Sequence, residues 1–86
     1  MANGSLETVV TEVFREILNR ASLQPDDDFF LAGGDSLLAT DAVIKLSEIT
    51  GSEIEMALMF TSPTARELAT AITTSADADG NGGYLG

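Results

Sequence analysis

Apolar residues recur at helical spacing along most of this 86-residue chain, and that spacing constrains the fold more than any other feature. They lie three or four positions apart, as on one face of an α-helix. The clearest run follows Ser5, a good helix N-cap. It comprises Leu6, Val9, Val10, Val13, Phe14, Ile17 and Leu18. The sequence therefore predicts a helix over residues 5–20.

Three further segments fit helices. Residues 36–50 are predicted to form the second helix, which ends at Gly51 because glycine suits the left-handed position there. Residues 54–60 suit one or two helical turns. Ser62 is expected to cap a last helix that has Pro63 at its first position. The apolar face of the second helix would hold Leu38, Ala42, Val43, Leu46 and Ile49, and that of the last would hold Ala65, Leu68, Ala69 and Ile72.

These segments predict an all-α fold, a small four-helix bundle of three long helices with a short third one. The chain is short enough to be one domain, expected over residues 5–74. Residues 1–4 are expected to be a flexible N-terminus. Residues 75–86 are small and polar and predict a disordered tail or linker.

A long loop over residues 21–34 separates the first two helices. Pro25 prevents the first helix from continuing, and three consecutive aspartates favour turns. A loop of this length needs an anchor. Phe29 and Phe30 interrupt its polarity, and we expect at least one of these rings to pack between the helices.

Charge and composition exclude several functions. The chain has 14 acidic and four basic residues, a net charge of −10, and no histidine or cysteine. A protein needs a basic face to bind nucleic acid or an anionic membrane surface, so neither is expected as a partner. No signal peptide or membrane span is visible, and we expect a cytoplasmic protein. The acidity favours either a basic protein partner or mere solubility.

The stretch Gly33-Gly34-Asp35-Ser36-Leu37 stands at the head of the second predicted helix. Asp35 is a good N-cap, which places Ser36 in the first turn, where the helix dipole favours a phosphate. A serine–histidine–acid triad is impossible without histidine. Ser36 is therefore interpreted as a covalent attachment point for a prosthetic group, against the alternative of a serine in a plain capping turn. No catalytic residue and no metal site is expected.

The segment Asp27-Asp28-Phe29-Phe30-Leu31-Ala32-Gly33-Gly34-Asp35-Ser36-Leu37-Leu38-Ala39-Thr40 resembles the signature of peptidyl carrier proteins, the thiolation domains of nonribosomal peptide synthesis. The resemblance extends from about Leu6 to Ile72 and implies an acyl-carrier-like fold. Two positions depart from the family pattern. Ala32 stands where leucine is usual, and Asp41 stands where many members carry a basic residue.

The resemblance implies that a phosphopantetheinyl transferase uses Mg²⁺ and coenzyme A to attach 4′-phosphopantetheine to Ser36. An adenylating enzyme would then load the thiol with an amino or aryl acid as a thioester. Condensation, tailoring or thioesterase enzymes would then act on this cargo. The carrier itself would catalyse no reaction. We expect it to be a monomer. Asp35 resembles the acid beside the modified serine. Leu37, Met56 and Met59 resemble the partner-contacting surface.

Two other functions remain open at this point. One is an acyl carrier of the fatty-acid or polyketide type, which more often shows a single glycine before the Asp-Ser-Leu triplet. The other belongs to a different class, an unmodified helical docking domain in which Ser36 only caps a helix. Modification of Ser36 separates the carriers from the docking domain, and the enzyme that loads the carrier separates the two carrier types.

Overall fold

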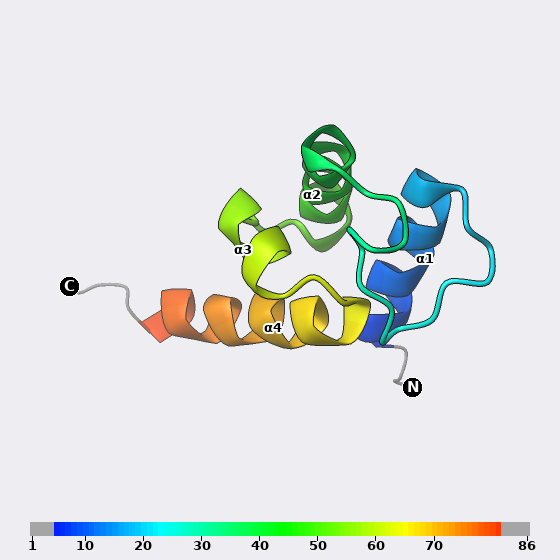
Figure 1. Cartoon of the computed structure of the whole chain (residues 1–86). Coiled ribbons are helices and arrows are strands. Elements are labelled where there is room, and N and C mark those ends of the chain that lie inside the picture. The colour runs from blue at the N-terminus through cyan, green and yellow to red at the C-terminus, as the bar shows by residue number, and fades with distance from the viewer. Residues whose placement is uncertain (1–4, 82–86) are drawn as a thin grey trace.

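The structure is a computed structural model that describes residues 5–81 of the chain, and the side chains of residues 5–74 (Figure 1). This part holds four helices and no strand, apart from an isolated bridge between Asp28 and Thr64. The all-α prediction of three longer helices and a short third one is therefore confirmed. The helices are α1 (Leu6–Leu18), α2 (Ser36–Thr50), α3 (Met56–Thr61) and α4 (Ala65–Asn81).

The helices share one apolar core. α1 contacts both α2 and α4, and the short α3 also contacts these two helices. In Figure 1, α4 runs along the lower edge with α2 and α3 above it, and α1 stands at the right, with its first turn beside the start of α4. The largest fully buried side chains come from all four helices and from the loop that joins α1 to α2. They are Phe14, Phe29, Leu46, Met59, Leu68 and Val10.

Both predicted ends of α2 are confirmed. Asp35 lies directly before the helix and caps it, and Gly51 follows it with a positive φ of 71°. Glycine adopts this backbone conformation without the strain that a Cβ atom would add. The α1 helix ends in the same way at Asn19, whose φ is 56°, and asparagine tolerates this region better than most residues.

The predicted start of α4 is wrong by two residues. Its cap is Thr64, whose hydroxyl accepts a hydrogen bond from the Glu67 amide at 3.1 Å. Ser62 instead ends α3. Pro63 lies outside the helix, and its carbonyl accepts a hydrogen bond from the Phe29 amide at 2.8 Å. Because this bond ties the segment before α4 to the long loop, Pro63 cannot take the first helical position.

The end of α4 also differs from expectation. Residues 75–81, expected to belong to a disordered tail or linker, continue the helix to Asn81. Adding a residue to an existing helix costs far less than starting one, and this stretch contains no proline that would stop it. The rest of the expected tail, residues 82–86, and the expected flexible N-terminus, residues 1–4, lie outside the described residues.

Candidate functional site

The predicted attachment point is held by a well-formed cap. Asp35 has an extended backbone, and its side-chain Oδ1 accepts a hydrogen bond from the Leu38 amide at 2.9 Å. Its backbone carbonyl accepts another from the Ala39 amide at 2.8 Å. The capping role predicted for Asp35 is therefore confirmed, and its carboxylate is directed to the backbone of α2.

Ser36 is the first residue of α2, and it is exposed. The first four amides of a helix have no partner within the helix. Here Asp35 satisfies those of Leu38 and Ala39, which leaves the amides of Ser36 and Leu37 at the helix end. These two donors lie beside the Ser36 side chain. An exposed hydroxyl with free amides next to it suits a bulky phosphate ester, because the amides and the helix dipole both favour negative charge there.

The two glycines before the cap serve different purposes. Gly33 has a φ of 120°, a conformation that side chains rarely permit. Gly34 has an ordinary φ, but a Cβ atom there would overlap the Phe29 ring and lie 2.8 Å from the Phe29 carbonyl oxygen. The Gly34 amide also donates to that carbonyl at 2.9 Å. The pair thus allows a turn and then a close approach to an aromatic ring.

Phe29 pins the long loop to the core, as the sequence predicts. Its ring is fully buried, with its centroid 4.7 Å from that of Phe14 on α1. Phe30 meets the Phe29 ring edge-on at 5.3 Å. The Asp28 carboxylate accepts hydrogen bonds from the amides of Phe30 and Leu31 at 2.8 Å and 3.0 Å, which closes a tight turn around the aromatic pair.

The predicted partner surface needs one correction. Leu37 is 72% exposed and Met56 is half-buried, so both remain accessible. Met59 has no exposed surface, because it faces the core from the middle of α3, and it cannot be a contact residue. Its neighbour Phe60 is 54% exposed instead, and its ring stacks on Phe30 with the centroids 5.3 Å apart.

Sequence reasoning missed Phe60 because α3 has only six residues. Two turns are too few for the apolar spacing to show which side of a helix faces the core. The usable signal was the aromatic pair in the loop. Phe14 and Phe29 fill the core together, so Phe30 needs another apolar partner, and Phe60 is the aromatic residue that remains among the described residues.

The described residues contain no group of three or more acidic side chains placed to hold a metal ion. The whole chain lacks histidine and cysteine. Within residues 5–81, no helix is both long and apolar enough to cross a membrane.

Comparison with known proteins places this site in a family. Residues 8–72 match the model of the phosphopantetheine attachment site. The chain is 43% identical over 63 residues to a linear gramicidin synthase from Brevibacillus parabrevis. That match covers 73% of this chain but 1% of the synthase, so the chain spans a very small part of this curated relative.

Solved structures agree with the sequence match. A nonribosomal peptidyl carrier domain is 32% identical, with a TM-score of 0.67 over 76% of this chain and 83% of that one. The fold also resembles a structure of the phosphopantetheine transferase Sfp in complex with coenzyme A and a peptidyl carrier protein. That match has a TM-score of 0.77 and 24% identity, and it covers 81% of this chain and 91% of the other. The chain therefore belongs to the phosphopantetheine attachment family and, within it, to the peptidyl carrier proteins of nonribosomal peptide synthesis.

Proposed function

We propose that Ser36 is the residue that carries 4′-phosphopantetheine in this protein. One observation carries the proposal: Ser36 is an exposed residue at the start of a capped helix, beside two amides that the cap leaves free. The phosphate of the group would lie at these amides and at the positive end of the α2 dipole. Membership of the phosphopantetheine attachment family supports the identity of the group, and the geometry of the helix end supports Ser36 as the residue that carries it.

The residues around Ser36 prepare the site without taking part in bond formation. Asp35 fixes the first turn of α2, and Gly34 brings the chain against Phe29 so that this turn stays in place. Leu37 offers an exposed apolar contact next to the hydroxyl. When attached, the prosthetic group supplies the thiol on which cargo is held as a thioester, which is consistent with a chain that lacks cysteine.

We propose that the protein is non-catalytic and serves partner enzymes in turn. These are a phosphopantetheinyl transferase, an adenylating enzyme, and condensation, tailoring or thioesterase enzymes. A tethered cargo gains effective concentration without tight binding, so brief contacts suffice for transfer. We further propose that it works as a cytoplasmic monomer, with residues 5–74 as the carrier domain.

The test is the intact mass of the protein before and after incubation with coenzyme A, Mg²⁺ and a broad-specificity phosphopantetheinyl transferase. We expect a gain of one phosphopantetheine in the parent and none in Ser36→Ala. Ser22→Ala removes another exposed serine, in the long loop, and should gain the group normally. A gain that persists in Ser36→Ala would place the attachment elsewhere. No gain on folded protein, with a control carrier modified in parallel, would favour the unmodified docking domain.

A second measurement separates the two kinds of carrier. The modified protein is offered to an amino-acid adenylating enzyme with ATP and a pool of amino and aryl acids, and separately to an acyltransferase with acyl-coenzyme A. Thioester formation only in the first reaction is the expected result. Loading only by the acyltransferase would identify a carrier of the fatty-acid or polyketide type.

A further inference from the structure

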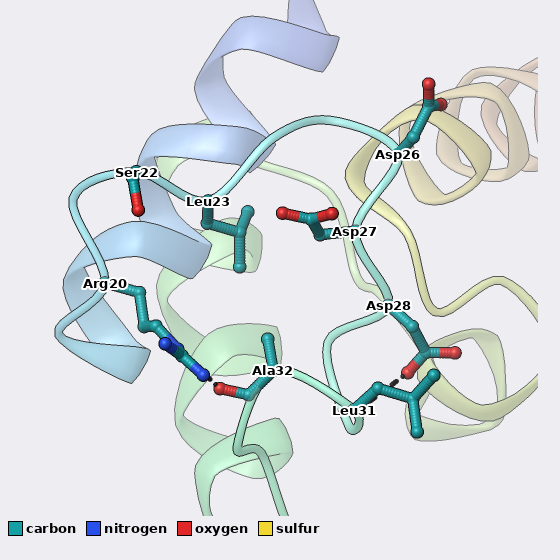
Figure 2. A pocket seen from close by; sticks show the side chains of 8 residues that line it. All are labelled: Arg20, Ser22, Leu23, Asp26, Asp27, Asp28, Leu31 and Ala32. Carbon is teal, nitrogen blue, oxygen red and sulfur yellow. Dashed lines mark hydrogen bonds between the residues drawn. The ribbon is translucent and has the colours of Figure 1, made fainter.

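The loop before Ser36 is weakly packed on one side. It surrounds a surface pocket with a volume of about 470 Å³, which Figure 2 shows from close by. Arg20 and Leu23 line one wall, and Leu31 and Ala32 line another. Leu31 is 87% exposed, so it contributes little to packing. Side chains therefore do not fill the space between the start and the end of the loop.

One polar contact crosses this space. The Arg20 Nε donates a hydrogen bond of 2.9 Å to the carbonyl oxygen of Ala32, drawn as a dashed line in Figure 2. The guanidinium is always charged, and a charge-assisted hydrogen bond is stronger than a neutral one. The backbone of Arg20 is itself fixed, since its amide donates to the Arg15 carbonyl at 2.9 Å. Arg20 thus links the end of α1 to the last turn of the loop.

The bonded carbonyl lies in a peptide unit that is flanked by two backbone hydrogen bonds. The Ala32 amide before it donates to the Asp28 carbonyl at 2.9 Å, and the Gly34 amide after it donates to the Phe29 carbonyl at 2.9 Å. The Ala32 carbonyl and the Gly33 amide share one planar unit. Gly33 has a φ of 120° and no atom within 4 Å of where its Cβ would be, so no neighbouring side chain packs against its Cα atom. The Gly33 amide donates to the Phe30 carbonyl at 3.2 Å. With Arg20 on the carbonyl, both polar groups of the peptide unit are hydrogen-bonded, which opposes its rotation.

We propose that Arg20 is a positioning residue that holds the Ala32–Gly33 peptide unit and thereby presents Ser36 to the modifying enzyme. The proposal rests on the function proposed for Ser36. It also gives a reason for a departure from the family pattern. Ala32 is only half-buried and replaces the usual leucine, so its side chain anchors the turn less than leucine would. A hydrogen bond to its backbone takes over that anchoring.

The structure supplies a matched control in Arg15. Its Nε donates to the Leu23 carbonyl at 2.7 Å, which is the same kind of bond at the start of the loop, farther along the chain from Ser36. Arg15→Met and Arg20→Met each remove one positive charge and one arginine–carbonyl bond. Both variants change the net charge by the same amount. A difference between their modification kinetics therefore reflects the position of the lost hydrogen bond. Arg20→Lys keeps a charged donor and should restore part of the function.

The first experiment measures steady-state kinetics of modification, with the carrier as the varied substrate of a phosphopantetheinyl transferase. Arg20→Met should raise the KM for the carrier about three- to tenfold and leave kcat unchanged, because a smaller fraction of molecules has the loop in the competent conformation. The KM of Arg15→Met should stay within about twofold of the parent value, because its lost hydrogen bond lies at the start of the loop. Equal KM values for Arg20→Met and the parent, or equal increases in both arginine variants, would overturn the proposal.

The second experiment follows amide hydrogen exchange on the unmodified protein. Exchange at the Gly33 amide should be faster in Arg20→Met than in Arg15→Met, while the melting temperature of Arg20→Met falls by no more than about 8 °C, because a single exposed bond is lost. Unchanged exchange at Gly33 would refute the positioning role. This readout needs no modification of Ser36. If the parent protein gains no phosphopantetheine, the proposed function fails, and the exchange rates alone decide the role of Arg20.

Discussion

At the scale of single residues, the glycines before Ser36 differ in what a side chain would meet. At Gly34 a Cβ atom would overlap the ring of Phe29, which is fully buried and cannot move away. At Gly33 there is open space, and only the backbone angle resists substitution. Replacing Gly34 is therefore opposed by packing, and replacing Gly33 is opposed by the backbone conformation.

Gly34→Ala should lower the free energy of unfolding by about 1–3 kcal/mol, the usual range for overpacking a core. Part of this loss should be recovered in the background Phe29→Leu, which removes the ring that the new methyl group meets. Gly33→Ala should lose stability equally in both backgrounds, because its penalty is local. Urea unfolding of the parent, the three single variants and the two double variants measures the coupling. Additive effects for Gly34 and Phe29 would contradict the packing explanation.

The residues that could be predicted from the sequence are those whose roles are local. Asp35 caps α2 through an amide three positions away, so a four-residue pattern was sufficient to predict it. Met59 and Phe60 could not be assigned in the same way. Which of them faces the core depends on where α2 and α4 lie around α3, and that arrangement is set by contacts between distant segments.

At the scale of helices, the start of α4 shows how two plausible caps are separated. Ser62 and Thr64 both have hydroxyls, and Pro63 favours Ser62 by sequence alone. The deciding contact is the hydrogen bond from the Phe29 amide to the Pro63 carbonyl, which holds Pro63 beside the loop. Thr64 is then the nearest residue that can cap the helix.

Thr64→Ala should therefore destabilise the protein by about 1 kcal/mol, the typical effect of removing a helix cap. Ser62→Ala removes a hydroxyl of similar size two residues earlier, and it should change the free energy of unfolding by less than about 0.5 kcal/mol. Chemical denaturation at one temperature compares the two variants directly. A larger loss in Ser62→Ala would restore the cap that the sequence suggested.

Three of the five residues predicted for the buried face of α2 are buried, namely Ala42, Val43 and Leu46, and Leu38 is half-buried. Ile49 was expected to share the face of Leu46 but is 51% exposed, while Ala39 is fully buried. At 100° per residue, the buried residues Ala39, Ala42, Val43 and Leu46 centre on one direction, and Ile49 lies about 70° from it. Apolar character alone predicted a wider face than the neighbouring helices cover.

At the scale of the whole molecule, the few basic side chains are all engaged within the chain, and the acidic side chains far outnumber them. All four basic residues bind groups of the same chain: Lys45 pairs with Glu16, Arg66 pairs with Glu7 and Asp26, and Arg15 and Arg20 bind backbone carbonyls. The paired side chains are all largely exposed, and such ion pairs contribute about 0–1 kcal/mol each. Repulsion within a net charge of −10 should therefore outweigh the attraction of these few pairs.

Sodium chloride should consequently raise the melting temperature. Between 0.01 M and 0.3 M salt, the screening length falls from about 30 Å to below about 10 Å, which weakens repulsion across the molecule. An increase of about 1 kcal/mol in the free energy of unfolding corresponds to a rise of roughly 4–8 °C in melting temperature for a domain of this size. The double variant Glu12→Lys/Glu53→Lys reverses two exposed charges and should show a smaller rise. A melting temperature that falls with salt would mean that ion pairs dominate, and that the acidity of this carrier does not oppose its folding.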